Sequence, residues 1–522
     1  MNLLTDPLFR IETLNGLEHQ DLPGLLEALG KDRVASLPGL QRHQEDAWHV
    51  FLCYLAGAVL NRAQSDDPRQ DAPFWRAGIR GLTRQDGGED DSAWILVVED
   101  PSKPAFMQTP CSSAGDARVY QPKAASPDAL DLLPTAKNHD LKACRAVTAQ
   151  PEDWVYALVS LQTMSGFFGS GNYGIARMNS GSGSRPVVAL EYHQGISGRW
   201  RDQVTRILAM RGELLGGVWG YRAKGLVLTW VPPWDHHTSL SLAQLDPFFI
   251  EVARPVRLTN SGHGIQALGV SSKAPRIAAK AANGRLGDPW IPINLGKQAA
   301  LTLSGAGITP ELLRNLLWED GFQLTPLQKP APASQWQGDG GLFSVAVLVR
   351  GQGTTDGFHQ VQLPIPGKTL PRLFGQGPER DALAFQSKIA LNDSGVMEQK
   401  VLKPAVLALL EGGPKQVNFD RREVSRWWTG VQREFAAAWA SEFFPWLWRV
   451  PDQPDRDTAR LEWLGILRRH AEAALASATA RYPQRQGRRY RARVRAEGIF
   501  IGSLYKLFPC LKENAHDHGG NG

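Results

Sequence analysis

The chain has 522 residues, of which 42% are hydrophobic and 21% charged, a composition typical of a globular protein large enough for two domains. No apolar run approaches the roughly 20 residues of a membrane-spanning helix, and the first residues lack the basic and apolar regions of a secretory signal, so we expect a cytoplasmic protein. The cysteines are far apart and form no Cys-x-x-Cys pair, which argues against a thiolate zinc site and a disulfide framework; they are Cys53, Cys111, Cys144 and Cys510.

The net charge of +6 is unevenly distributed along the chain. Residues 376–522 contain 23 Lys and Arg against 17 Asp and Glu, whereas the residues before them contain 35 of each. A basic part attached to a neutral part predicts a polyanion as the partner of the basic part.

The first 375 residues alternate short apolar segments with connections rich in glycine and proline. Helical spacing of apolar residues predicts one helix that includes Trp48 to Leu60 and a second over 153–164. Short β-rich runs predict strands at 93–98, 186–190, 225–230 and 343–349. We therefore predict an irregular mixed α+β domain with long loops over residues 1–375.

Glycine becomes rarer after residue 375, and helical periodicity becomes the dominant pattern. It predicts four helices, at about 396–411, 422–440, 458–480 and 489–508. Asp420 and Asp457 are predicted to cap the second and third helices. Their apolar stripes suit packing around one core, so we predict a C-terminal four-helix bundle over residues 376–522 and an α+β fold for the whole chain.

Gly169 to Gly174 has the spacing Gly-x-Gly-x-x-Gly of a dinucleotide-binding loop, and Glu191 lies about 20 residues further on. Such a site needs a strand before the glycines and a helix after them. Here the predicted helix at 153–164 precedes, and a Ser- and Gly-rich segment follows. Two alternatives are left: a loop whose bare backbone approaches a ligand closely, and a plain flexible connection.

Two histidine-containing segments could supply metal ligands, Asp235-His236-His237 and His516-Asp517-His518. Neighbouring side chains in a chain diverge, so we interpret the first segment as a turn and the second as part of a solvated tail. The common hydrolase and NTPase motifs are absent. We expect no catalytic residues, no metal and no cofactor.

Residues 481–495 contain seven arginines. On a helix at 489–508 these side chains would occupy more than one face. The planar guanidinium donates two parallel hydrogen bonds to a phosphate, which predicts contacts with a nucleic-acid backbone. The predicted contacts are Arg485, Arg488, Arg489, Arg491, Arg493 and Arg495. The alternative is a solvated face that pairs with Glu472 and Glu497.

The segment Arg350 to Gly357 directly follows the predicted strand at 343–349 and consists mainly of small residues and one amide. This composition is typical of a hairpin tip. Such a tip either turns the chain or serves as an inserted probe.

Several of these pieces, taken in order, resemble the Cascade large subunit (CasA) family of type I-E CRISPR systems. Met1 to Asp6 is similar to the family's opening, and Pro104-Ala105-Phe106-Met107-Gln108-Thr109 to its Pro-Phe-Met-Gln segment. Gly166-Phe167-Phe168-Gly169-Ser170-Gly171 is similar to its Gly-Phe-Gly-Gly-Gly loop. The hairpin tip and the helical C-terminal part follow in the expected order, so the resemblance spans nearly the whole chain.

The resemblance implies a function without catalysis in antiviral defence. Guide RNA reads the target, the protein reads the adjacent PAM in double-stranded DNA, and strand separation then forms an R-loop. The implied partners are crRNA, double-stranded target DNA, the backbone, small and crRNA-end-binding Cascade subunits, and a helicase-nuclease.

The resemblance also implies roles for particular residues. Gly169, Ser170 and Gly171 would read the PAM from the minor groove. A wedge hairpin would be formed by Gln352, Gly353, Thr354 and Thr355, and a guide and PAM loop by Lys137, Asn138 and His139. The family's reading lysine has no clean counterpart; the candidates are Lys280, ranked first, then Arg276, Lys273 and Arg257. The helical domain would contact the displaced strand and help to present DNA to the helicase-nuclease.

The chain departs from the family in two respects: it lacks the cysteine cluster that some members carry for zinc, and residues 240–292 align poorly. Two rival interpretations therefore stay open. One is a cytoplasmic enzyme that binds a phosphorylated ligand with the glycine loop. The other is a scaffold subunit that touches DNA only through its basic helices.

Overall fold

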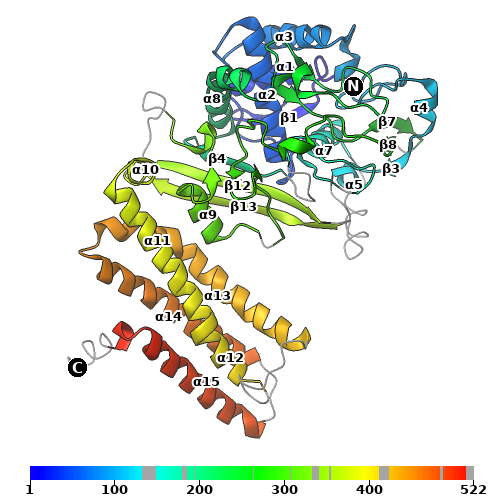
Figure 1. Cartoon of the computed structure of the whole chain (residues 1–522). Helices are drawn as coiled ribbons and strands as arrows, with labels where there is room; N and C mark the ends of the chain where they lie inside the picture. Colours follow the sequence, from blue (N-terminus) through cyan, green and yellow to red (C-terminus); the bar gives the residue numbers. More distant parts are fainter. Residues whose placement is uncertain are drawn as a thin grey trace. The chain divides into compact units, whose positions relative to one another are not determined.

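The computed structural model describes residues 1–131, 149–167, 169–178, 185–193, 195–262, 264–305, 307–331, 340–351, 354–410, 422–481 and 486–512. The chain folds into two compact units (Figure 1). The first consists of Met1–Ile308 and Glu319–Pro364, and the second of Thr309–Trp318 and Ile365–Gly522. The functional division into a reading domain, 1–375, and a helical domain, 376–522, stays a prediction.

The first unit mixes helices with small sheets. Its helices are α1 (Leu22–Gly30), α2 (Glu45–Ala63), α3 (Ala72–Gln85), α4 (Ala114–Arg118), α5 (Pro127–Asp131), α7 (Pro151–Met164) and α8 (Ile196–Gly216). Short 3-10 turns occur at η1 (Asp91–Trp94), η2 (Leu242–Gln244), η3 (Lys280–Ala282) and η4 (Pro326–Gln328). The described elements of the second unit are helical except for Ile365 and Pro366 at the end of β13, so the predicted α+β fold with a helical C-terminal region is confirmed.

Five small sheets are described in the chain. Antiparallel β1 (Phe9–Thr13) and β2 (Gly16–Gln20) form a hairpin, and β5 (Leu226–Leu228) pairs in parallel with β6 (Leu245–Ile250). One three-stranded sheet has the order β13 (Thr354–Pro366), β12 (Gly340–Gly351), β4 (Val187–Glu191). A second has the order β3 (Gln121–Ala124), β8 (Gly264–Gly269), β7 (Val256–Ser261). The third has the order β10 (Ala299–Ala300), β9 (Ile293–Asn294), β11 (Phe322–Gln323).

Most sequence-based expectations for the first unit are confirmed. The predicted helices correspond to α2 and α7, and the strands at 186–190 and 343–349 to β4 and β12. The strand at 225–230 is present but shorter, as β5. The strand predicted at 93–98 is wrong: its first residues belong to η1, and only Ile95 makes an isolated bridge. Asp90 starts this turn by accepting a hydrogen bond from the Ser92 amide, so an apolar run that resembles a buried strand enters the core as a turn.

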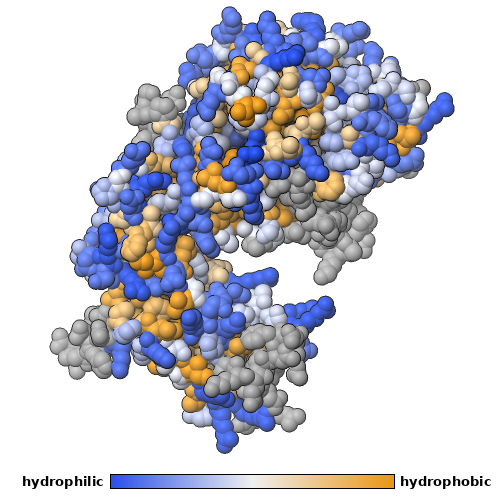
Figure 2. Space-filling model, viewed as in Figure 1, coloured by the Kyte–Doolittle hydropathy of each residue, from blue (hydrophilic) through white to orange (hydrophobic). Residues whose placement is uncertain are grey.

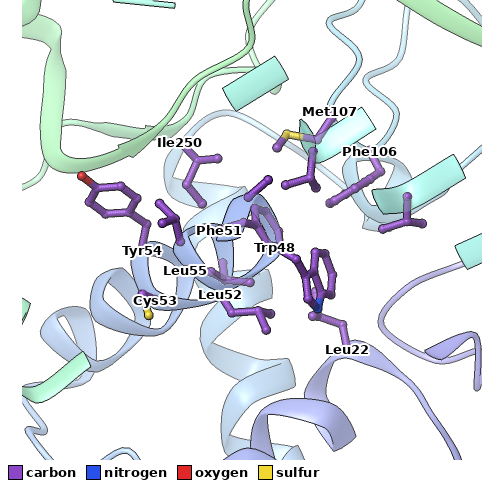
Figure 3. Close-up of a cluster of buried hydrophobic side chains, with 14 of the residues drawn as sticks. Leu22, Trp48, Phe51, Leu52, Cys53, Tyr54, Leu55, Phe106, Met107 and Ile250 are labelled. Carbon is purple, nitrogen blue, oxygen red and sulfur yellow. The ribbon is translucent and has the colours of Figure 1, made fainter. Parts of the chain in front are cut away.

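Helix α2 forms the centre of the first unit, because every residue from Ala47 to Leu60 is buried. A helix that is apolar on all sides belongs inside a core. Figure 3 shows its side chains, Trp48 and Phe51 among them, surrounded by Leu22, Phe106, Met107 and Ile250 from other segments. The Trp48 and Phe51 rings stack with their centroids 5.1 Å apart, so aromatic packing adds to the burial of apolar area.

The segment Pro104–Thr109, which carries part of the family resemblance, is buried in this core. The Gln108 side chain donates to the carbonyls of Leu96 (2.8 Å) and Phe106 (3.1 Å) and accepts from the Leu258 amide (2.6 Å). Its amide therefore satisfies backbone groups inside the protein, which is a structural role.

The second unit contains the short helix α9 (Pro310–Leu317), which precedes the hairpin of β12 and β13 in sequence, and a series of helical elements after residue 365 (Figure 1). These elements are α10 (Leu370–Phe374), α11 (Pro378–Val396), the π-helix η5 (Met397–Leu402), α12 (Lys403–Ala408), α13 (Arg422–Arg449), the 3-10 turn η6 (Val450–Asp452), α14 (Arg456–Arg481) and α15 (Gln486–Leu507). The first predicted helix begins earlier than expected, because η5 connects α11 to α12 without a break. The other three are confirmed as α13, α14 and α15.

The cap of α14 differs from the expectation. Asp455 accepts hydrogen bonds from the Thr458 amide (2.7 Å) and from its hydroxyl (3.1 Å), whereas Asp457 lies inside the first turn. Asp455 is therefore the N-cap, and the assignment of Asp457 is wrong. Asp420 lies outside the described residues.

Aromatic side chains of α13 and α14 pack together in the core of the second unit and contact α11. The Trp446 and Trp463 rings lie 4.9 Å apart, and the Trp463 indole donates to the Ala390 carbonyl at 3.0 Å. Arg460 adds a bidentate pair with Asp393. Hydrophilic residues cover most of the visible surface of the molecule, with small hydrophobic patches between them (Figure 2). Within the described residues, no helix has the length and apolar character needed to cross a membrane.

Candidate nucleic-acid interface

The glycine loop, defined here as residues 165–174, begins where α7 ends. Its two ends cross in direct backbone contact at Gly174, where a Cβ atom would lie only 2.7 Å from the Gly166 carbonyl carbon and the Phe167 nitrogen. The Ile175 amide donates to the Ser165 carbonyl at 3.0 Å, and Arg254, a buried side chain, donates to the Gly166 carbonyl at 2.7 Å. These contacts fix the base of the loop.

The tip of the loop is a turn closed by a hydrogen bond from the Asn172 amide to the Gly169 carbonyl at 2.9 Å. Gly171 has φ +80°, and a Cβ atom there would lie 2.5 Å from the Ser271 Cβ. Its carbonyl accepts from the Ser272 amide at 3.1 Å. Ser170 is exposed, and the space around a Cβ on Gly169 is open. The tip therefore packs against Ser271 and Ser272 on one side and presents bare backbone on the other.

Lys273 lies directly after this contact and is exposed. Its amide donates to the His236 carbonyl at 2.7 Å, and its own carbonyl accepts from the Tyr173 hydroxyl at 3.0 Å. The backbone of Lys273 is thus held from both sides while its ammonium group stays in solvent. The structure brings this lysine to the glycine loop, although the sequence ranks it below Lys280 and Arg276.

Arg276 is buried and donates to the carbonyls of Thr229 (2.9 Å), Pro232 (2.8 Å) and Pro233 (3.1 Å). Burial lowers its pKa to about 10. Arg257 is also buried, and it donates to four backbone carbonyls, those of Val98, Asp100, Lys103 and Thr109. Both guanidinium groups hold loops together, so neither is available to a ligand in solvent.

Lys280 is exposed at the first residue of η3. The same turn ends at Ala282, which lines a cavity of about 510 Å³ together with Trp219 and Leu295. Lys273, in contrast, is tied to the glycine loop by the hydrogen bond from the Tyr173 hydroxyl to its carbonyl.

The segment Asp235 to Thr238 is a turn, in agreement with the interpretation from sequence. Asp235 accepts from the amides of His237 (2.9 Å) and Thr238 (2.8 Å), and these bonds lower its pKa to about 2. His236 has φ 64° and turns inward, where its Nε2 lies 3.2 Å from the Tyr120 hydroxyl and burial lowers its pKa. The side chains diverge, and the described residues contain no group of three or more side chains suited to a metal ion.

A buried ionic network lies below the C-terminal end of the glycine loop. Glu251 accepts from the Ala176 amide at 2.6 Å and lies 3.6 Å from the Arg177 guanidinium. Asp288 lies 3.3 Å from the Arg177 Nε and also pairs with Arg185. Burial raises the pKa of Glu251, an effect that Arg177 opposes. The network anchors the chain as it leaves the loop, because a buried charge requires a partner.

In the second unit, α15 carries most of the predicted backbone contacts. It buries one stripe, Ala496, Phe500 and Leu504, and leaves its described arginines exposed. Arg493 pairs with Glu497 at 2.7 Å, whereas within the described part of the chain Arg489, Arg491 and Arg495 make no ion pair. Glu472 pairs with Arg468, so Arg493 follows the alternative of a self-paired face, whereas Arg489, Arg491 and Arg495 do not within the described residues. Tyr490, 75% exposed, lies among these arginines. Arg485 lies outside the described residues, and Arg488 is exposed.

The hairpin predicted around residues 350–357 is confirmed, since β12 ends at Gly351, β13 begins at Thr354, and the two are neighbours in one sheet. Thr354 and Thr355 belong to β13, whereas Gln352 and Gly353 lie outside the described residues. The guide and PAM loop with Lys137, Asn138 and His139 also lies outside them.

No protein-family model matches the chain, and no curated protein matches its sequence. Solved structures match its fold. Thermus thermophilus CasA (Cse1) is similar with a TM-score of 0.61 at 16% identity, over 97% of this chain and 99% of that one. The CRISPR-associated protein Cse1 from Acidimicrobium ferrooxidans has a TM-score of 0.59 at 14% identity, over 97% and 98%. Thermobifida fusca Cse1 has a TM-score of 0.60 at 12% identity, over 98% of each chain. The resemblance to CasA is therefore confirmed at the level of the fold.

Proposed function

We propose that this protein is the large subunit of a type I-E Cascade complex and that it reads a PAM in double-stranded target DNA with the glycine loop and Lys273. One observation carries the proposal: the open backbone of Gly169 and the exposed Ser170 lie on a fixed base beside an exposed lysine. In the proposed complex, crRNA pairs with the target strand and the other Cascade subunits hold the guide. The DNA is then passed to a helicase-nuclease in antiviral defence.

The chemistry of the loop suits the minor groove of B-DNA. That groove is about 6 Å wide and offers few features that distinguish the bases, so its shape matters as much as its hydrogen-bonding pattern. A glycine tip enters such a groove without a side chain to fill it. Lys273 adds a flexible point charge that donates to base-edge or sugar acceptors. A reader of this kind accepts several related motifs rather than a single one.

The other predicted contacts complete the proposal. Gln352, Gly353, Thr354 and Thr355 form the wedge that opens the first base pair, a step whose unstacking costs on the order of a few kcal/mol. Lys137, Asn138 and His139 contact the guide end. The exposed arginines of α15 bind phosphates of the displaced strand, which adds affinity without sequence preference.

The rival function, an enzyme that holds a phosphorylated ligand in the glycine loop, has weaker support. The loop follows the C-terminal end of α7, where the helix dipole is negative and disfavours a phosphate. After the loop the chain enters the network of Arg177, Glu251 and Asp288 rather than a helix N-terminus. We assign no catalytic step to the chain.

The test is a binding titration with a guide-RNA complex reconstituted with and without this chain. The duplex carries the protospacer beside a randomised neighbour, and bound DNA is sequenced. Enrichment of a short flanking motif only when the chain is present supports the proposal and identifies the motif. Tight binding without a flanking preference supports the scaffold function instead. DNA binding that does not depend on the chain contradicts the CRISPR function. Lys273→Ala should remove the enrichment, whereas the matched variant Lys280→Ala should leave it intact.

A further inference from the structure

The glycine loop and Lys273 come from distant parts of the chain, and two hydrogen bonds join them. One runs from the Ser272 amide to the Gly171 carbonyl at 3.1 Å. The other runs from the Tyr173 hydroxyl, on the loop itself, to the Lys273 carbonyl at 3.0 Å. Of the two, only the Tyr173 bond uses a side chain, so substitution can remove it without touching the backbone.

The position of Tyr173 is well defined by its surroundings. Its ring lies 6.0 Å from the ring of Phe167, at the other end of the loop. The next residue, Gly174, makes the backbone crossing that closes the loop base. The hydroxyl therefore extends from the constrained end of the loop to the segment that carries the exposed Lys273.

The opposite side of Lys273 is held as well. Its amide and that of Ala274 both donate to the His236 carbonyl, at 2.7 and 3.3 Å. His236 is itself held by the Tyr120 hydroxyl and by the T-shaped contact of its ring with Trp234. Without the Tyr173 bond, the lysine segment would stay attached to the His236 turn but would lose one of its two links to the loop.

We infer that Tyr173 is a positioning residue that couples the glycine loop to Lys273, so that the two contacts meet the DNA as one rigid unit. This inference rests on the proposed function and adds to it the source of selectivity. Two contacts held at a fixed separation fit only those duplexes whose groove has the matching shape. Two contacts that move independently bind many duplexes at similar affinity, because each adapts to the groove separately.

The test compares Tyr173→Phe with Tyr192→Phe in the complete guide-RNA complex. Tyr173→Phe keeps the ring beside Phe167 and removes only the hydroxyl. In the control, the lost hydroxyl accepts from the Ala331 amide at 2.8 Å, in the same unit as the loop. Affinities are measured for a duplex with the selected motif and for one with a scrambled neighbour, and the melting temperature of each free protein is recorded.

We expect Tyr173→Phe to reduce the ratio of the two affinities about three- to tenfold, the effect of one neutral hydrogen bond, while affinity for the scrambled duplex changes less than twofold. Tyr192→Phe should leave the ratio unchanged even where it lowers the melting temperature. An unchanged ratio in Tyr173→Phe, with Lys273→Ala still losing selectivity, overturns the coupling and leaves the proposed function standing. An equal loss of affinity for both duplexes shows that Tyr173 contributes to folding alone, which also overturns the coupling. If Lys273→Ala keeps full selectivity, the proposed function itself fails.

Discussion

The glycine loop and α15 are two of the parts of the chain proposed to meet DNA, and they are built in opposite ways. The loop offers backbone groups and is held from below by buried side chains: Arg254 on the Gly166 carbonyl, and Glu251 and Asp288 around Arg177. Helix α15 is held by one apolar stripe and offers side chains, with Arg489, Arg491 and Arg495 unpaired within the described residues. Selective reading of a DNA groove thus needs protein groups held in a fixed shape, whereas affinity for the phosphate backbone needs charged side chains that are not already paired.

The largest effect is expected from the anchor below the loop. Asp288→Ala removes the carboxylate shared by Arg177 and Arg185 and leaves two buried cations with fewer partners. We expect a loss of about 3–5 kcal/mol in the unfolding free energy of the first unit, measured by denaturant titration with tryptophan fluorescence. Asp288→Asn keeps the shape and one acceptor oxygen, so it should lose less unfolding free energy. Equal stability of Asp288→Ala and the wild type would show that the loop does not depend on this network.

The next effect concerns the tip. Gly171→Ala places a methyl group 2.5 Å from the Ser271 Cβ at a backbone angle of φ +80°, so it should strain the loop by about 1–3 kcal/mol and abolish most motif preference. The measurement is the affinity ratio for motif and scrambled duplexes. Adding Ser271→Gly removes the clash but not the unfavourable φ, so the double variant should recover part of the ratio. No recovery would show that the backbone angle alone controls the tip.

Helix α15 should respond differently. The double variant Arg491→Ala, Arg495→Ala should weaken binding equally on motif and scrambled duplexes and reduce the slope of log K against log salt by about 1.4, or about 0.7 per phosphate contact with the displaced single strand. Arg493→Ala should have a smaller effect, because its guanidinium is already paired with Glu497. A change in motif preference in the double variant would contradict the division of roles between the two regions.

The same comparison explains which parts of the site sequence reasoning could find. Glycine spacing after a helix located the loop, and arginine density located α15, because both signals are local. Lys273 was ranked low because its partners, Gly171 and His236, are distant in sequence. Arg276 was ranked above it because sequence does not distinguish a cation in solvent from one surrounded by the carbonyls of Thr229 and Pro232. The missed signal was the pair of serines before Lys273, small residues that allow close approach to a glycine.

Similar reasons account for the errors in the fold. The apolar run at 93–98 has the composition of a buried strand, but the Asp90 cap places its first two residues in η1, so a cap three residues before the run outweighs β propensity. The acids at 455 and 457 both suit an N-cap, and only the geometry of the Thr458 amide distinguishes them. Element types were predictable where periodicity was long, as in α2 and α13 to α15, and boundaries were not.

The smallest effect concerns the turn that holds Lys273 from the other side. Asp235→Ala removes the acceptor of the His237 and Thr238 amides and loosens the turn whose His236 carbonyl holds the Lys273 amide. Since Asp235 is only half-buried, we expect about a twofold loss of motif preference and little change in unfolding. The pKa of this carboxyl is lowered to about 2, from an ordinary value of 3.8. A depressed carboxyl pKa contributes stability that is complete above the ordinary value and is lost as the pH falls through the folded one. The difference in unfolding midpoint between wild type and Asp235→Ala should therefore be constant from pH 5 to 8 and shrink only below about pH 4. If the difference in unfolding midpoint instead changes between pH 5 and 8, the stability of the turn depends on the titration of a histidine. His236, in its buried contact with Tyr120, would then be the first residue to substitute.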